Sequence, residues 1–461
     1  MGPEAARPLE GCVHAEAEAR GSPVTSNRSI DARVVGLALP ALGALAADPL
    51  VSIVDTAFVG RLGVVPLAAL GVNASVFSLA FVVFNFLAYG TTPMVARALA
   101  RGDRRAAGKL AVEALTLACA AGVVATALLL ALAEPVLALM GATGELGAPA
   151  LSYLRIRALA GPAVLIVTAG HGIFRGWQDT RTPLWITLGL NLVNLVLDPL
   201  LIFGLGWGLE GAAIATVVAQ WSGAALFLVL ILGTRREAMG IELRLPRPRD
   251  LRPLLRVGGA LLIRTLSLVS TLTLATAVAT RLGTAQVAAH QVASQLWLLL
   301  ALVVDALAVA AQAMVGGAEE DEARRVGNRI LLWGLIVGIV LAATFAAARP
   351  WLPRLFTSDP DAVSRVDRLL PFIIWMQPLN AVVFVWDGIL MGAQRFRILA
   401  VQMLLSAAVA AALLLRVVPS GWGLDGVWWA IVALMAVRAI TLAGTWWLPA
   451  GRSHSRDQRV P

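Results

Sequence analysis

The sequence predicts an all-α integral membrane protein with twelve transmembrane helices in two homologous halves of six. Three observations predict this class. The chain of 461 residues is 59% hydrophobic and only 14% charged, and its mean hydropathy of +0.80 is too high for a soluble protein of this length. Apolar runs of membrane-spanning length recur along the chain, and the second half repeats motifs of the first.

Twelve apolar segments are each long enough to cross a membrane, because about 20 mostly apolar residues span the hydrocarbon core as a helix. A β-barrel would instead have short segments of alternating polarity. Arg, Gly, Pro or a short polar stretch ends each segment. The predicted spans cover residues 34–59, 66–96, 107–132, 150–174, 183–204, 210–233, 254–281, 286–315, 327–348, 368–391, 398–418 and 424–448.

Basic residues predict how the spans are oriented. They concentrate in the loops of one side, as in Arg97 to Lys109, Arg175 to Arg181 and Arg235 to Arg256. The positive-inside rule assigns this side and both termini to the cytoplasm, although basic residues in the loop after the ninth span are an exception. The net charge of +9 is therefore a topology signal, and we expect no nucleic-acid partner. Cys12 and Cys119 match no disulfide, metal or redox spacing.

The internal repeat predicts the domain organisation. Arg61-Leu62-Gly63 recurs as Arg281-Leu282-Gly283, and the same offset of 220 superposes further residue pairs without gaps. Gly176 with Gln178 recurs as Gly392 with Gln394. Because each half has six spans, the halves are expected to be parallel repeats with the substrate site between them. The predicted division is a tail 1–30, an N-lobe 31–233, a linker 234–253, a C-lobe 254–448 and a tail 449–461.

Ionisable side chains within the spans are candidates for function, because each costs about 2.5 to 3.5 kcal/mol in the membrane interior. Arg155, Arg157 and Arg416 lie near predicted span ends, and we expect them to reach the interface by snorkelling. The other such groups are Asp48, Asp55, Glu113, His171 and Asp198 in the first half, and Arg264, His290, Asp305, Asp387 and Arg438 in the second.

Asp55, Asn194 and Asp198 are the strongest candidates for an ion site. Asn194 and Asp198 are four residues apart and share one face of a helix. Two carboxylates and a carboxamide in one cavity can hold a proton or offer oxygens to Na⁺. The repeat places Ala275 and Leu414 where the two acids would recur, so the site is expected in the first half only. The alternative is that both acids cap helix ends or breaks.

The second half supplies candidates for a substrate cavity. They are Asp305, Asp387, Arg264, Trp297, Trp375 and Trp386. The two acids can attract a cationic substrate or form structural ion pairs with Arg264 or Arg438, and the sequence leaves both open. The tryptophans can stack aromatic cations. The roles of Asp48, His171 and His290 are equally open, since an isolated His is more often a packing residue.

The sequence has no Walker-type nucleotide motif, no metal-ligand cluster and no catalytic triad. We therefore expect no enzymatic activity and no cofactor. An ion gradient then supplies the energy, unless the protein is a passive channel.

Several further motifs occur in an order and spacing that together are specific. They are Val54-Asp55-Thr56 with Gly60, Pro93 with Arg97, Asn194 to Asp198 followed by Pro199 to Gly204, Gly208 to Gly211, and Ala289-His290-Gln291. With these motifs, from about Ile30 to Leu448, the chain resembles the multidrug and toxic compound extrusion (MATE) family. Within that family it is similar to the branch of the DNA-damage-inducible protein F.

This resemblance implies a V-shaped central cavity between the lobes and exchange of H⁺ or Na⁺ for small, often cationic organic molecules by alternating access. The family's cation site falls on Asp55, Asn194, Asp198 and Thr216, and the first three would ligate the metal if the ion is Na⁺. The resemblance leaves the choice of ion open.

Two other functions remain as alternatives. A flippase for a lipid-linked saccharide would need several basic residues in the cavity, and only Arg264 and Arg438 lie deep enough; an uncoupled channel or receptor is the third possibility. We expect a monomer in the lipid bilayer that binds a small organic substrate. The Ala- and Arg-rich composition with a single Lys is typical of a GC-rich bacterial genome and predicts the inner membrane.

Overall fold

The computed structural model describes residues 27–355 and 360–447. Within these ranges the regular elements are helices and no strand occurs, so the all-α prediction is confirmed. The predicted tail 449–461, most of the tail 1–30 and Cys12 lie outside the described residues.

The helices follow the predicted spans closely. The first half contains α2 (Asn27–Gly60), α3 (Val64–Val82), the 3₁₀ turn η1 (Val83–Asn85), α4 (Phe86–Ala100), α5 (Arg104–Ala131), α6 (Ala133–Leu139), η2 (Gly144–Leu146), α7 (Gly147–Ala158), α8 (Gly161–Gly176), α9 (Arg181–Pro199), the π turn η3 (Leu200–Gly204), α10 (Gly208–Leu228) and the π turn η4 (Val229–Thr234). The second half contains α11 (Arg252–Leu282), α12 (Thr284–Gly316), α13 (Glu320–Ala348), η5 (Pro353–Leu355), α14 (Pro360–Gly392), α15 (Phe396–Val417) and α16 (Gly423–Trp447).

In the described part of the chain, eleven helical segments are long and apolar enough to cross a bilayer. A twelfth span results when α7 and α8, which are bent by 49° relative to each other, are taken together. The second span is also interrupted, by η1 between α3 and α4. Their counterparts α12 and α14 in the second half are continuous helices. The two halves share one plan, but the first half has breaks that the second lacks.

The repeated Arg-Leu-Gly motif marks the tight turn between the first and second spans of each half. Gly63 has φ 122° and Gly283 has φ 129°. Residues with a side chain rarely adopt this conformation, and Gly adopts it freely. The motif therefore recurs because the same turn occurs twice.

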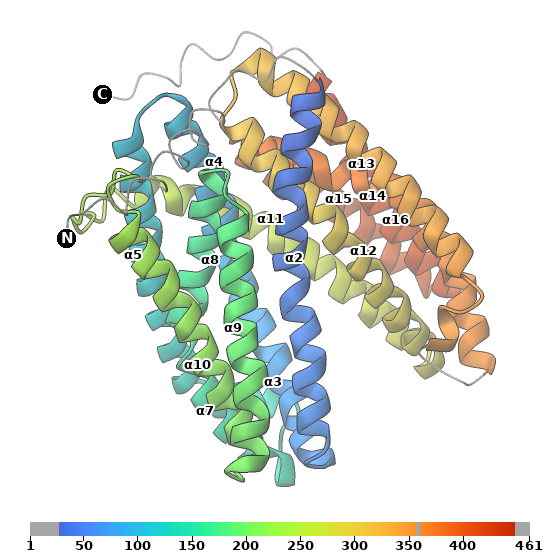
Figure 1. Ribbon diagram of the computed structural model, residues 1–461. Helices are drawn as coiled ribbons and strands as arrows, with labels where there is room; N and C mark the ends of the chain where they lie inside the picture. Colours follow the sequence, from blue (N-terminus) through green and yellow to red (C-terminus); the bar gives the residue numbers. More distant parts are fainter. Residues whose placement is uncertain (1–26, 356–359, 448–461) are drawn as a thin grey trace.

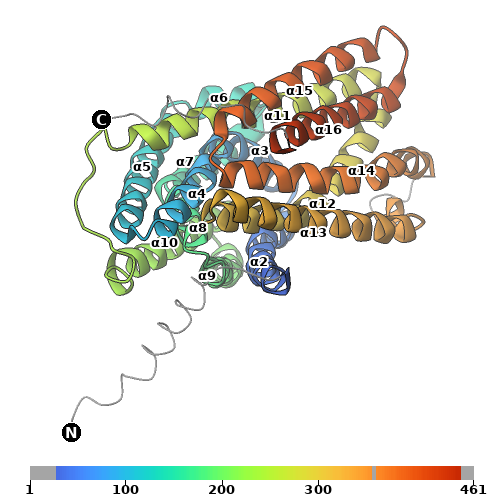
Figure 2. The same cartoon turned by 90° about the horizontal axis from the view of Figure 1, so that it is seen from above.

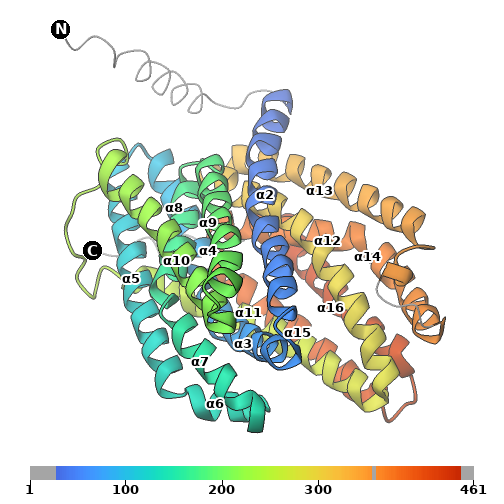
Figure 3. The same cartoon turned by 60° about the horizontal axis from the view of Figure 1, so that its bottom comes forward.

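The helices of the two halves form two groups, which converge near the start of α2 and diverge toward the opposite side (Figure 1). Helix α2 lies between the groups, next to α9 on one side and α12 and α13 on the other (Figures 2 and 3). Its early residues Ile30, Val34 and Leu37 belong to the apolar cluster of the second half. Val59, near its other end, belongs to a cluster of the first half.

Two equivalent glycines allow close helix crossings in the two halves. A Cβ atom at Gly172 of α8 would lie 2.8 Å from the Cα of Ala88 in α4. A Cβ atom at Gly388 of α14 would lie 2.7 Å from the Cα of Ala308 in α12. Close approach of helix backbones at small residues is typical of packing within membranes. The sequence also repeats here, as Gly172-Ile173 and Gly388-Ile389, and this repeat reflects the same crossing.

We expect Gly172→Ala and Gly388→Ala to lower stability, because the added methyl group meets backbone that has to move. Overpacking of this kind costs about 1 to 3 kcal/mol. The measurement is the melting temperature of the purified protein in detergent. Gly259→Ala in α11 is the matched control, since a Cβ atom there would meet no neighbouring heavy atom within 4 Å. Equal melting temperatures for all three variants would contradict the tight crossing.

Candidate functional site

The predicted ion-site residues come together between α2 and α9. Asp198 and Asn194 are 1% and 4% exposed, and the Asn194 side-chain amide donates a hydrogen bond of 3.2 Å to Oδ1 of Asp198. The Asp55 carboxyl group lies within hydrogen-bond reach of the Asp198 carboxyl group. Oδ1 of Asp55 and Oδ2 of Asp198 are buried and have no hydrogen-bond partner. Such unsatisfied oxygens are where a proton or a cation would bind.

The local sequence explains the position of Asp198. It precedes Pro199, which cannot donate a backbone hydrogen bond, and the chain continues as the π turn η3. Single π turns within helices occur frequently at functional sites. Gly211 of α10 packs directly on this turn, because a Cβ atom there would lie 2.8 Å from the carbonyl carbon of Leu201. The backbone around the carboxylate is thereby held in place.

Tyr153 and Arg157, which the sequence did not indicate as site residues, border the acids. Tyr153 of α7 is buried and lies near both carboxyl groups, within hydrogen-bond reach of Thr216 and of Arg157. Thr216 therefore contacts the site through Tyr153, while its own hydroxyl donates to the backbone oxygen of Ala212 at 2.9 Å. The signal in the sequence is the i, i+4 spacing of Tyr153 and Arg157, which places both on one helical face.

The prediction that Arg157 snorkels to the membrane surface is wrong. Helices α7 and α8 together form the fourth span, and Arg157 lies next to the break between them. Its guanidinium lies 4.9 Å from the ring centre of Phe77, and its Nη1 is buried without a hydrogen-bond partner. Asp55 and Asp48 are the acids whose charges act on it. Arg155 and Arg416, by contrast, are exposed.

Asp48 forms a second contact between the same two helices. Its Oδ1 accepts a hydrogen bond of 2.9 Å from the side-chain amide of Asn191. Asp48 and Asp55 are seven residues apart on α2, and Asn191 and Asp198 are seven apart on α9. Seven residues are close to two helical turns, so each pair of residues lies on one helical face. The two contacts are therefore stacked along the α2–α9 interface.

A cavity of about 270 Å³ opens beside Asp48. Its polar lining comes from five helical elements of the first half and from η1. These polar residues are Asp48, Asn85, Tyr89, Thr168, His171, Arg175, Thr187 and Gln220. His171 is held by Thr187, whose Oγ1 is 3.2 Å from the His171 Nε2. This cavity lies within the first half rather than between the halves.

Arg175 was predicted to lie in a loop, and this is also wrong. It belongs to the last turn of α8, is 5% exposed and lines the cavity. Asp305 of the second half is the acid whose charge acts on it. A basic residue at a span end is ambiguous in sequence, because a tilt of the helix decides whether it meets water or protein.

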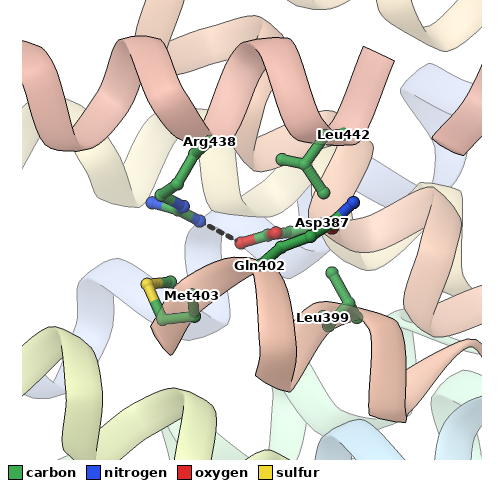
Figure 4. Close-up of a pocket in the computed structure, with 6 residues that line it drawn as sticks. All are labelled: Asp387, Leu399, Gln402, Met403, Arg438 and Leu442. Atoms are coloured by element: carbon green, nitrogen blue, oxygen red, sulfur yellow. Dashed lines mark hydrogen bonds and ion pairs between the residues drawn. The ribbon is translucent and has the colours of Figure 1, made fainter. Parts of the chain in front are cut away.

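Asp387 in the second half forms buried ion pairs with both Arg264 and Arg438. Figure 4 shows Asp387 facing Arg438, with Gln402, Met403 and Leu399 around them. The pocket at this point holds no space for a water molecule. Of the two possibilities left open by the sequence, the structure has the ion pairs. The two arginines considered for a lipid-linked saccharide are thus engaged with Asp387.

The other predicted cavity residues do not line the cavity of the first half. Asp305 accepts a hydrogen bond of 3.4 Å from the Tyr89 hydroxyl, which links the two halves. Trp297 and Trp386 are each 5% exposed and belong to the apolar core of the second half. Trp375 is 83% exposed on the outer surface. His290 contacts Thr276 at 3.3 Å and packs edge-on against Trp428.

Comparison with known proteins identifies the family. The sequence profile described as MatE matches residues 40–200 and 261–415, and thus both halves. The chain belongs to the MatE family. Protein DETOXIFICATION 44, chloroplastic, of Arabidopsis thaliana is 36% identical over 433 residues, which are 90% of this chain and 82% of that protein.

A bacterial MATE relative and a solved structure agree with this assignment. The DNA damage-inducible protein F of Escherichia coli K12 is 30% identical over 434 residues, which are 91% of this chain and 92% of that protein. The crystal structure of a MATE in the bent conformation has a TM-score of 0.83 at 22% identity and covers 93% of this chain and 96% of its own. The predicted membership of the family and its fold are therefore confirmed. The chain is a multi-pass membrane protein of a transporter family.

We expect Asp387→Asn to destabilise this MATE protein, because Arg264 and Arg438 would be left as buried charges without a carboxylate. Removing one partner from a buried ion pair costs about 3 to 5 kcal/mol. Asp425→Asn, at an exposed position at the start of α16, is the control and is expected to change stability little. The melting temperatures of the two purified variants test this. A melting temperature of the Asp387→Asn variant close to that of the unaltered protein would contradict a stabilising ion pair.

Proposed function

We propose that this MATE transporter exports small organic molecules in exchange for H⁺ or Na⁺, with Asp55, Asn194 and Asp198 holding the coupling ion. The observation that carries the proposal is the pair of facing carboxyl groups with one buried, unpartnered oxygen on each. Two carboxylates this close do not both ionise readily in a low-dielectric site without a cation between them. A bound proton or cation removes this repulsion.

Either ion has suitable ligands here. A proton shared by Asp55 and Asp198 leaves one negative charge, which the nearby Arg157 balances. Na⁺ would use carboxylate oxygens of both acids and the carboxamide oxygen of Asn194, which are the hard ligands that such a cation prefers. Among the described residues, no group of three or more His, Cys, Asp or Glu is arranged to hold a metal. The coupling cation is transported and is not a resident cofactor.

The stacked contacts on α2 and α9 suggest how the ion and the substrate are coupled. The ion binds at Asp55 and Asp198, while the cavity begins at Asp48, two turns along the same helical faces. A shift of α2 relative to α9 that follows ion binding therefore changes the cavity as well. Coupling requires such differential binding to two states. Alternating access of the cavity to the two sides of the membrane then completes the exchange.

The cavity chemistry fits a small polar substrate. Asp48 supplies a negative charge that attracts organic cations, and Arg175 supplies a positive charge for a substrate that also bears an acidic group. A relative's name supports a multidrug range of substrates: the probable multidrug resistance protein NorM of Thermotoga maritima is 29% identical over 72% of this chain.

We place both termini and the Arg-rich loops in the cytoplasm, according to the positive-inside rule. We further propose a bacterial inner membrane and a monomer that has no nucleic-acid partner. The Arabidopsis relative is named chloroplastic, and we take this location as a property of that protein alone.

We expect Asp55→Asn and Asp198→Asn each to reduce gradient-driven uptake of a fluorescent organic cation into inverted vesicles to near background. The carboxamide can neither take up a proton nor supply a charged ligand. Uptake is measured with a pH gradient alone and with a Na⁺ gradient alone, so the same experiment identifies the ion.

Glu113→Gln is the matched control. Glu113 is also a buried acid within a span of the first half, but its partner is Lys109 at 3.6 Å and it lies away from the α2–α9 interface. We expect this variant to retain uptake. Undiminished uptake in both aspartate variants would show that the ion binds elsewhere.

A further inference from the structure

Two glutamines have a backbone conformation that is unusual for their residue type. Gln178 has φ 57° and Gln394 has φ 58°, and within residues 27–355 and 360–447 no other residue with a side chain has a positive φ. Gln178 follows α8, and Gln394 follows α14. Both occupy the position after a helix where Gly is usual, because a Cβ atom is disfavoured in this conformation.

The backbone hydrogen bonds of the two helix ends are the same. The amide of Gln178 donates to the carbonyl of Arg175 at 2.9 Å, and the amide of Asp179 donates to the carbonyl of Phe174 at 2.9 Å. The amide of Gln394 donates to the carbonyl of Met391 at 2.9 Å, and the next amide, of Arg395, donates to Leu390 at 2.9 Å. This pattern is a Schellman motif. Gly would satisfy it equally well, so the backbone alone does not explain a glutamine.

The glutamine side chains reach across to the opposite half of the molecule. Nε2 of Gln178 donates to the backbone oxygen of Ala313 in α12 at 3.4 Å. Nε2 of Gln394 donates to the backbone oxygen of Pro93 in α4 at 3.1 Å. Pro93 and Ala313 are themselves related by the repeat offset of 220. The two contacts are therefore equivalent in the two halves, with donor and acceptor exchanged.

Arginines fix the orientation of both carboxamides. Nη2 of Arg33 in α2 donates to Oε1 of Gln178 at 2.7 Å, and Nη1 of Arg97 in α4 donates to Oε1 of Gln394 at 2.9 Å. A guanidinium has donors only, so the side-chain oxygen must face the arginine and the NH₂ group must face the backbone oxygen. Gln394 is thus bound twice by α4, through Arg97 and Pro93.

The turn that carries Gln178 is anchored on its own half. Asp179 accepts hydrogen bonds from the Thr182 hydroxyl at 2.6 Å and from Arg235 at 3.0 Å. Partial burial would raise the pKa of Asp179, but these hydrogen bonds hold the pKa below its ordinary value. The carboxylate therefore stays ionised, and the turn stays attached to the first half.

All these contacts lie on the side of the molecule that carries the basic loops Arg97 to Lys109, Arg175 to Arg181 and Arg235 to Arg256, which we call the Arg-rich side. The two helix groups converge on this side in Figure 1. Gly316 allows α12 to approach there, since a Cβ atom would lie 3.1 Å from the Cα of Pro93. A further contact on this side joins Asp31 of α2 to Arg329 of α13 at 2.6 Å. Within the described residues, the hydrogen bonds that join α3–α10 to α11–α16 lie on this side, with one exception. The exception is the bond between Tyr89 and Asp305, which lies further along the helices.

We propose that Gln178 and Gln394 form a pair of latches that hold the Arg-rich side of the transporter closed and that must release before this side opens. The latches would be the gate of one side in the proposed alternating access, and this inference rests on that proposed function. A neutral carboxamide suits a reversible latch. When the halves separate, water replaces the hydrogen bonds of the carboxamides, including the one from Arg97, and the latches contain no ion pair that has to be pulled apart.

The test compares the closed side in the full-length protein with and without the latches. Spin labels are placed on Arg101→Cys and Asp321→Cys, both exposed on the Arg-rich side, after Cys12→Ser and Cys119→Ser. A second labelled pair, Glu145→Cys and Arg354→Cys, reports on the opposite side. Distances are measured by pulsed electron paramagnetic resonance in detergent and in nanodiscs.

We expect the double variant Gln178→Gly with Gln394→Gly to shift the distance between residues 101 and 321 to longer values. Each single variant is expected to shift it less. Gly retains the helix cap, so the melting temperature confirms that the variants are folded. The double variant Gln178→Asn with Gln394→Asn also keeps the cap and the carboxamide, but its side chains are one methylene shorter. We expect it to open the side as well.

An unchanged distance between residues 101 and 321 in the folded Gly double variant would overturn the proposal. The second pair separates this result from the proposed function. If the Arg-rich side opens and the distance between residues 145 and 354 shortens, both the latch and alternating access are supported. If the Arg-rich side opens while the distance between residues 145 and 354 stays constant, the result supports the latches and contradicts alternating access.

Discussion

The contact between α2 and α9 is the interaction on which the functional architecture depends. A carboxylate in the interior of a membrane protein is costly unless a charge or hydrogen bonds compensate it. Along this interface one acid, Asp48, is paired with an amide, and two others, Asp55 and Asp198, face each other with unsatisfied oxygens. Helix α2 also packs against the second half with its early residues. A change at the acids therefore reaches both halves through one helix.

The two halves treat buried charge in different ways. In the second half, the Asp387 carboxylate is paired with both Arg264 and Arg438, and the pocket beside them has no space for a water molecule. A structural ion pair requires such an arrangement. In the first half, the acids keep free oxygens, and Arg157 approaches them without completing its own hydrogen bonds. The broken second and fourth spans occur in this same half. The half whose acids keep free oxygens is thus also the half whose helices are interrupted.

The repeat and its departures together describe a transporter with a nearly symmetric frame. The helix crossings at Gly172 and Gly388, the turns at Gly63 and Gly283, and the glutamine contacts recur in both halves. Under the proposed alternating access, these features would give the two halves equivalent surfaces. Asp55 and Asp198 have no counterparts at the repeat positions Ala275 and Leu414, as the proposed single ion site would require. The features that recur in both halves are therefore those of helix packing and turns, whereas the residues of the proposed ion site occur in the first half only.

The sequence by itself determined the class of protein, the positions of the spans and the half that carries the acids. These follow from local properties: hydropathy over about 20 residues, the i, i+4 spacing of Asn194 and Asp198, and a repeat visible in the order of the residues. The tertiary structure alone decided which charges meet. Arg157 lies beside the acids at the break between α7 and α8. Arg175 faces a cavity because of how α8 packs, and Asp387 contacts both arginines because three helices converge on it. Contacts between residues far apart in the chain depend on helix tilt and rotation, and a pattern along one helix does not contain that information.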